Sequence, residues 1–175
     1  MNGSRKKGLF ITADIVAALI FILLDQFTKH LAVIHLKDRP SLILWPKVFE
    51  LRYLENRGAA FGMLQGQKLF FLTITCIVVI GIIYILCKIP ENKKYNILHI
   101  LLVLVFSGAI GNMIDRIRLS YVVDFFYFVL IDFPIFNMAD IYVSVACVLL
   151  AILMIFVYKD EDLEFISMKS LKGSK

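Results

Sequence analysis

Charged residues are scarce in this sequence, since Asp, Glu, Lys and Arg make up 19% of its 175 residues while 60% are hydrophobic. A soluble domain has about 25% charged and about 45–50% apolar residues. The deficit of charge argues against a soluble globular protein. Because the apolar residues are gathered into long blocks, we expect one integral membrane domain covering residues 1–175.

Motifs for several kinds of chemistry are also missing. The three cysteines lie in apolar blocks without C-x-x-C spacing, and the three histidines form no H-E-x-x-H motif. We therefore expect neither a disulfide framework nor a metal site. No G-x-S-x-G, Walker A or G-x-G-x-x-G sequence occurs, so a serine hydrolase or a nucleotide cofactor has no support.

The net charge of +5 raises the question of a nucleic-acid partner. The basic residues, however, are scattered along the chain and form no stripe interleaved with exposed aromatic residues. We expect no nucleic-acid binding, and a membrane surface explains the charge better.

Four stretches are long and apolar enough to span a bilayer, whose core of about 30 Å needs about 20 helical residues. They are residues 8–36, 69–87, 97–114 and 135–158. The basic cluster before the first stretch resembles a secretory signal. No A-x-A-like cleavage site follows it, so we expect the first stretch to remain as a membrane helix.

An even number of spans places both termini on one side of the membrane. Lys and Arg are almost equally divided between the two sides, so the positive-inside rule hardly discriminates. The basic cluster at residues 5–7 favours cytoplasmic termini.

The segments outside the spans predict different kinds of structure. Residues 37–68 are too polar to span, but residues 49–53 (FELRY) alternate in polarity, which predicts a strand of a small surface sheet. We expect a short interfacial helix at residues 59–64 and an interfacial course for residues 121–136. The charged tail, residues 159–175, is expected to fray in solvent.

Ionisable residues recur near one end of the spans. Asp25 and Lys29 lie near the end of the first span, Asp115 and Arg116 end the third, and Asp140 lies about one turn into the fourth. A charge at bilayer depth costs about 2.5–3.5 kcal/mol on insertion scales, so each needs a reason. Consecutive hairpins bring these residues to one membrane face. They either assemble a polar site or merely anchor helices, and Asp25 with Lys29 also fits a simple (i, i+4) ion pair.

Asp124 and Asp140 stand apart from the other acidic residues. Each is flanked by apolar residues, and Asp140 has no basic residue within helical reach. Two carboxyl groups that meet in low dielectric cannot both ionise, so one keeps a proton while the other acts as a base. Such a pair activates water against an amide, which predicts an aspartyl peptidase.

Four blocks then carry a resemblance to a known family. They are residues 25–29 (DQFTK), residues 56–62 (NRGAAFG), residues 108–116 with 122–125 (GAIGNMIDR and VVDF), and residues 133–140 (FPIFNMAD). In this order, within residues 8–158, they resemble the bacterial lipoprotein signal peptidases, or type II signal peptidases. The resemblance implies that Asp124 and Asp140 are the catalytic residues. It implies supporting roles for Asp25, Lys29, Asn56, Gly58, Gly108, Asn112, Arg116 and Asn137, although Gly108 also fits close helix packing.

The same resemblance implies the substrate, the place and the fold. The substrate is a prolipoprotein that carries a diacylglyceryl group on a cysteine, cleaved just before that cysteine without a cofactor and inhibited by globomycin. The enzyme lies in the bacterial inner membrane with cytoplasmic termini and a site near the outer face. The fold has four transmembrane helices, a small extracytoplasmic sheet called a cradle, and an interfacial helix within residues 37–68. We expect a monomer.

Two other kinds of protein remain open on the residues alone. One is a proton- or cation-coupled carrier whose membrane aspartates bind ions, although inverted repeats and broken helices are not evident. The other is an assembly partner whose polar residues only join helices.

Overall fold

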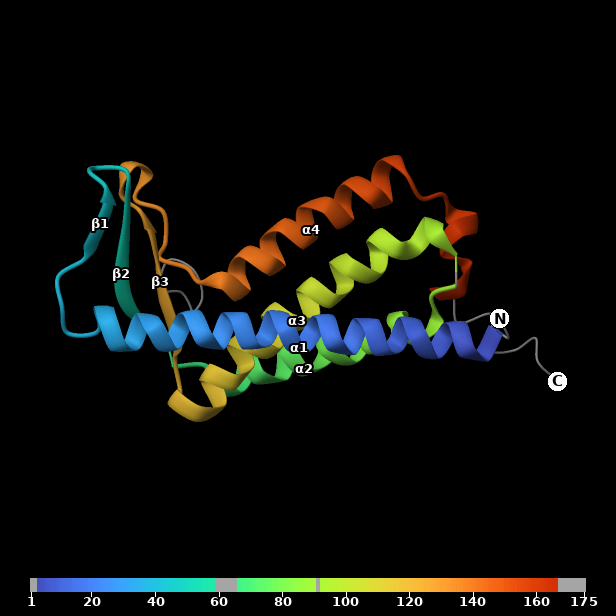
Figure 1. Ribbon diagram of the computed structural model, residues 1–175, viewed down its shortest axis with the longest axis horizontal. Coiled ribbons are helices and arrows are strands. Elements are labelled where there is room, and N and C mark those ends of the chain that lie inside the picture. Colours follow the sequence, from blue (N-terminus) through green and yellow to red (C-terminus); the bar gives the residue numbers. More distant parts are fainter. Residues whose placement is uncertain (1–2, 59–65, 91, 167–175) are drawn as a thin grey trace.

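Four long helices and a small sheet make up the computed structural model, which describes residues 3–58, 66–90 and 92–166. The helices are α1 (Gly3–Leu36), α2 (Lys68–Lys88), α3 (Asn96–Leu119) and α4 (Met138–Phe156). All four are long and apolar enough to cross a membrane. They run along the molecule with the sheet at one end (Figure 1), so the predicted four spans and small sheet are present.

All four helices have bounds that differ from those predicted, and the differences in α3 and α4 lie at the sheet end. α3 continues to Leu119, five residues beyond the expected end, and stops where Ser120 adopts a left-handed conformation with φ of 68°. α4 begins at Met138 because Asn137, in extended conformation, caps it. Phe136, just before that cap, forms an antiparallel bridge with Phe126 and belongs to the sheet end of the molecule.

The sheet has three antiparallel strands in the order β1 (Leu42–Trp45), β2 (Phe49–Asn56) and β3 (Val122–Phe128). β2 contains the alternating segment that predicted a strand. The sequence predicted an interfacial course but no strand for residues 121–136, and the structure forms β3 there, which pairs with β2. Its β-branched and aromatic residues favour a strand, and the first four are buried between the helix ends and the sheet.

The connection between the sheet and α1 is apolar. Ala32 and Leu36 of α1 pack with Val123 and Phe125 of β3 in one buried cluster. This packing fixes β3 against the end of α1. The interfacial helix expected at residues 59–64 lies outside the described residues.

The other end of the bundle is closed by the first part of the tail. The short helix η4 (Asp160–Ile166) packs its Leu163 and Phe165 on a cluster that includes Tyr95 and Tyr158. Lys94 pairs with Asp162 at 2.6 Å. The expectation that the tail frays is therefore wrong for η4, because its apolar side chains find a buried partner; residues 167–175 lie outside the described range.

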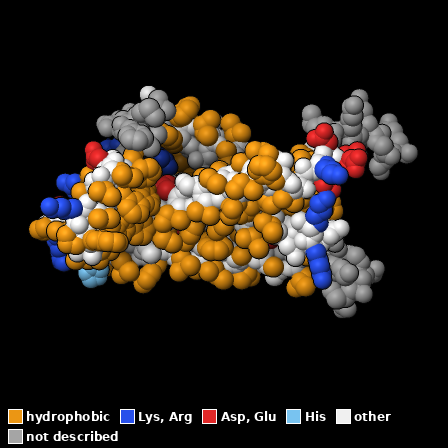
Figure 2. Space-filling model, turned by 90° about the horizontal axis from the view of Figure 1, so that it is seen from above, with side chains coloured by type: hydrophobic (Ala, Val, Ile, Leu, Met, Phe, Trp, Pro, Cys, Tyr) orange, Lys and Arg blue, Asp and Glu red, His pale blue; other side chains and the backbone are white. Residues whose placement is uncertain are grey.

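α3 is the central helix of the bundle. α1, α2 and α4 each pack against it, whereas α1 and α2 hardly touch one another. Hydrophobic side chains cover the middle of the molecule and basic side chains gather near its two ends (Figure 2). This distribution is that of a protein embedded in a bilayer.

Candidate active site

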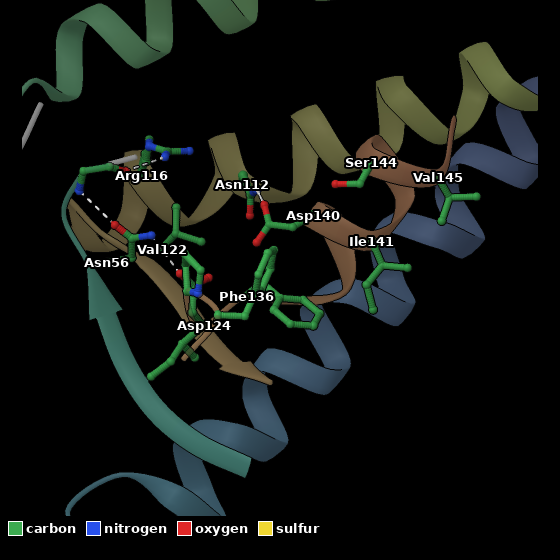
Figure 3. A pocket seen from close by; sticks show the side chains of 14 residues that line it. Asn56, Asn112, Arg116, Val122, Asp124, Phe136, Asp140, Ile141, Ser144 and Val145 are labelled. Atoms are coloured by element: carbon green, nitrogen blue, oxygen red, sulfur yellow. Dashed lines mark hydrogen bonds between the residues drawn. The ribbon is translucent and has the colours of Figure 1, made fainter. Parts of the chain in front are cut away.

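A cavity of about 480 Å³ lies at the sheet end of the bundle, where β2, β3, α3 and α4 meet. Its polar side is formed by Asn56, Gly58, Asn112, Arg116, Asp124 and Asp140, and its mostly apolar side by Val122, Phe133, Pro134, Ile135, Phe136, Ile141, Ser144 and Val145. Asp124 and Asp140 face the same cavity from different elements (Figure 3). Two carboxyl groups 16 positions apart in the sequence are thus brought to one place.

Asp124 lies in β3 and is 1% exposed. Its carboxylate accepts hydrogen bonds from Asn56 Nδ2 at 2.8 Å and from Asn137 Nδ2 at 2.6 Å. Burial, and then the neighbouring charge of Asp140, raise the pKa of Asp124 to about 7, against the lowering effect of the two amides. Asp124 therefore holds a proton at a pH where an ordinary aspartate has lost it.

Asp140 lies in the first turn of α4, as part of a capping box. Asn137 Oδ1 accepts from the Asp140 backbone N–H at 3.1 Å, and the Asp140 carboxylate accepts from the Asn137 backbone N–H at 3.1 Å. Asn112 Nδ2 donates to the other carboxylate oxygen at 2.9 Å. These donors, beside a helix N-terminus, suit a carboxylate that accepts hydrogen bonds.

Two asparagines join the aspartates into one network. Asn137 donates to Asp124 through its side chain and to Asp140 through its backbone. It also donates to Asn112 Oδ1 at 3.2 Å. Asn137 is fully buried, so it fixes the position of both carboxyl groups.

Behind the cavity, a buried lysine supports the network. Lys29 is 3% exposed, and its Nζ lies 3.0 Å from Asp25, 3.0 Å from Asp115 and 2.9 Å from Asn112 Oδ1. Because Lys29 donates to the oxygen of Asn112, the amide nitrogen of Asn112 is left to donate to Asp140. The (i, i+4) pair of Asp25 and Lys29 is therefore part of the site's support as well as a helix contact.

Asp25 connects the first helix to the last. Its Oδ1 accepts from the backbone N–H of Ala139 at 3.0 Å, across 114 positions of sequence. The Asp25 side chain is fully buried and packs against Gly111, where a β-carbon would overlap its carboxylate. α1 thus holds the first turn of α4 in place.

Arg116 and Gly58 lie at the rim of the polar side. The guanidinium of Arg116 donates to the carbonyl of Gly58 at 3.3 Å and stacks on Phe71 of α2, with 4.6 Å between Cζ and the ring centroid. Gly58 N donates to Asn56 Oδ1 at 3.0 Å, which orients the amide that contacts Asp124. Arg116 therefore contacts the loop and not the aspartates themselves.

Gly108 lies apart from the cavity. A β-carbon there would meet the Ala139 carbonyl oxygen at 2.5 Å and Val143 Cγ2 at 2.7 Å. The residue thus lets α3 and α4 approach closely. Gly108 affects the site because it sets the position of α4, which carries Asp140.

Several residues that the structure brings to the site had no specific role among the predictions from sequence. Asp115 pairs with Lys29 and accepts from the Val123 backbone N–H at 3.1 Å, and Gln26 donates to Asp115 at 3.0 Å. Both lie within the blocks listed above. Ser144 follows Asp140 by four positions, and Ile141 and Val145 are also four positions apart, so the i, i+4 spacing along α4 was the available signal for this wall of the cavity.

Within residues 3–58, 66–90 and 92–166, no group of three or more His, Cys, Asp or Glu side chains is arranged to hold a metal ion. The chemistry of the cavity is that of two carboxyl groups and the amides around them.

Known proteins similar to this chain share one description. A sequence profile described as signal peptidase (SPase) II matches residues 17–156. The lipoprotein signal peptidase of Caldanaerobacter subterraneus subsp. tengcongensis is 50% identical over 143 residues, covering 81% of this chain and 94% of the relative. That of Streptococcus thermophilus is 42% identical over 147 residues, covering 84% and 93%.

Solved structures with the same fold are bacterial membrane enzymes determined by the in meso method. One, at 2.3 Å resolution, has 32% identity and a TM-score of 0.76 and covers 95% of this chain and 94% of its own. Another, at 1.9 Å, has 34% identity and a TM-score of 0.74 and covers 85% and 96%. With the family profile spanning most of its length, the chain belongs to the signal peptidase II family of membrane peptidases.

Proposed function

We propose that this chain is an aspartic endopeptidase that uses Asp124 and Asp140 to remove the signal peptide from prolipoproteins. Family membership supports signal-peptide cleavage. The shared cavity of the two carboxyl groups, joined through Asn137, carries the assignment of the aspartic mechanism.

The mechanism follows from the different surroundings of the two aspartates. Asp140 takes a proton from a water molecule, whose oxygen attacks the carbonyl carbon of the scissile amide. Protonated Asp124 donates a hydrogen bond to the carbonyl oxygen. As the C–N bond breaks, a proton passes to the departing nitrogen, and the pair returns to sharing one proton. The reaction consumes one water and uses no cofactor.

The walls of the cavity fit a substrate that is part peptide and part lipid. Peptide groups find donors and acceptors at Asn56, Asn112 and Arg116. On the other side Ile141, Ser144 and Val145 extend along α4, whose Ser144 and Val145 are exposed on the membrane-spanning surface. A diacylglyceryl-modified cysteine placed there leaves its acyl chains in the bilayer, and the bond before that cysteine meets the aspartate pair.

The same reasoning gives the orientation. The sheet and the aspartate pair lie at one end of the bundle, and the first residues of α1 and η4 lie at the other (Figure 1). Prolipoproteins are processed after export, so we place the pair near the outer face of the inner membrane and the termini in the cytoplasm. A cysteine introduced at Lys47, in the turn between β1 and β2, should react with a membrane-impermeant maleimide in intact cells. We further propose that the enzyme acts as a monomer and binds no nucleic acid.

The decisive experiment is a gel-shift assay on a diacylglyceryl-modified precursor with Asp124→Asn and Asp140→Asn. Each variant should lose at least about 1,000-fold in processing rate, since the members of a catalytic unit act together. Asp38→Asn is the matched control: this exposed residue ends the turn after α1 with φ of 57°, a conformation that Asn tolerates. Globomycin should block the wild-type reaction. Normal processing by either active-site variant would refute the proposal.

A further inference from the structure

A second cavity, at the opposite end of the bundle from the aspartate pair, is almost wholly apolar. It has a volume of about 480 Å³ and lies between α1 and α2, with α3 as its floor. The walls come from residues 11–22 of α1 and 83–87 of α2, and the floor from residues 103–110 of α3. It exists because α1 and α2 pack on α3 and hardly on one another.

The acidic residue in this groove is already paired. Asp14 lies 2.8 Å from Nδ1 of His99, which comes from α3 and stacks on Phe10. This contact joins α1 to α3, and the Asp14 carboxylate thus has its partner inside the protein. What the groove presents to its surroundings is hydrocarbon, so a polar or charged ligand body does not fit.

The length and depth of the groove match one leaflet. From Ile11 to Ile22 an α-helix rises about 16 Å, and half of a hydrocarbon core of about 30 Å is about 15 Å. Cys87, which lines the groove, is followed by Lys88 at the end of α2. The groove therefore runs from the membrane surface on the side of the termini to the middle of the bilayer.

Two lysines lie at the surface end of the groove. Lys7 precedes Ile11 by about one helical turn and is exposed, and Lys88 ends α2 on the other wall. Ammonium groups at this level meet the phosphates of the lipid headgroups. The basic side chains at the mouth suit the phosphate of an anionic phospholipid, and the apolar walls suit its acyl chain.

We propose that this groove binds one acyl chain of an anionic phospholipid from the leaflet on the side of the termini, with its phosphate beside Lys7 and Lys88. The lipid fills the gap between α1 and α2 and completes the packing around α3. The proposal is independent of the peptidase reaction, because the site lies at the far end of the bundle from the aspartate pair.

The test uses the fact that the chain has a single tryptophan, Trp45. In a Trp45→Phe background, Leu19→Trp places a reporter on the α1 wall of the groove, and Ile152→Trp places a control on lipid-facing α4; the wild-type side chains are 54% and 44% exposed. The full chain is reconstituted in vesicles that contain brominated phosphatidylglycerol or brominated phosphatidylcholine. Bromine quenching reports which lipid contacts each tryptophan.

The groove reporter should be quenched more strongly by phosphatidylglycerol than by phosphatidylcholine, and the α4 reporter equally by both. Lys7→Gln and Lys88→Gln should each lower the preference by about five-fold, while Lys159→Gln on the same side should not. If phosphatidylcholine quenched the groove reporter as strongly as phosphatidylglycerol does, the proposal would be overturned. So would an unquenched groove reporter with a dimer in native mass spectrometry, since a second copy would then fill the groove. Ile15→Trp, at a position 55% exposed on the same wall, replaces Leu19→Trp if that variant does not fold.

Discussion

Asn137 donates a hydrogen bond of 2.6 Å from its side-chain amide to the Oδ1 atom of Asp124. The same residue is the N-cap of α4, where its side-chain oxygen accepts from the Asp140 backbone. One side chain thus starts a membrane helix and positions a carboxyl group on a strand. The two tasks use different atoms, so they are separable by substitution.

Asn137→Ser should keep the cap but lose the contact with Asp124, because a serine hydroxyl caps helices well and is too short to reach β3. We expect processing to fall by about 100-fold, as for other losses of positioning. Asn137→Ala should lose as much activity and a further 0.5–2 kcal/mol or so of stability. Thermal unfolding in detergent and a processing assay measure the two effects. Equal stabilities of the Ser and Ala variants would show that the cap contributes nothing.

The proton on Asp124 predicts the direction of the pH dependence. Its pKa is raised to about 7 by burial and by Asp140. In the proposed mechanism Asp124 is protonated below that pH and donates to the substrate carbonyl; as the pH rises through about 7, Asp124 loses this proton. kcat/KM should therefore fall on the alkaline side with an apparent pKa near 7 that belongs to the pair. An increase in kcat/KM through the same range would contradict the assigned roles, and Asp38→Asn should follow the wild-type profile.

The buried lysine predicts a difference between two ion pairs. Lys29→Met leaves Asp25 and Asp115 buried without their shared cation, which should cost about 3–5 kcal/mol. Lys37→Met removes a partly exposed pair with Glu55, whose side chains are 39% and 29% exposed, and should cost far less, because solvent screens exposed ion pairs. Chemical or thermal unfolding of the two variants compares them directly. Similar losses would mean that the buried charges relax without Lys29.

Gly108 predicts that helix packing controls the site from a distance. Gly108→Ala puts a β-carbon against the Ala139 carbonyl, so α4 must shift and take Asp140 with it. Overpacking of this kind costs about 1–3 kcal/mol, and processing should fall with it. Gly81→Ala is the control, because no atom lies within 4 Å of a β-carbon there. Normal activity of Gly108→Ala would show that α4 is free to move without disturbing Asp140.

Much of the architecture was predictable because the membrane imposes it. Long apolar blocks have one stable form in a bilayer, so the four spans followed from composition and length. The two isolated aspartates stood out for the same reason, since a buried carboxyl group without a local partner is costly. The structure places them at one cavity.

Residues whose roles depend on distant partners were harder to predict. Asp115 was noted as the end of a span, but its hydrogen bond to the Val123 backbone exists only because the chain turns back at Ser120. β3 was not predicted as a strand because its aromatic residues also suit the membrane interface, and its pairing with a distant segment, β2, is not visible in the local sequence. The packing of η4 likewise depends on Tyr95 and Tyr158, which no local pattern connects to it.

The hydrogen bond from the Ala139 backbone to Asp25 has a consequence for biosynthesis. The carboxylate that holds the beginning of the fourth helix emerges from the ribosome more than a hundred residues before the amide it receives. A nascent chain that has inserted three helices carries Asp124 and Lys29 but lacks both Asp140 and the helix that Asp25 steadies. If Asp140 has the proposed catalytic role, the chain therefore stays inactive until its last span has been inserted.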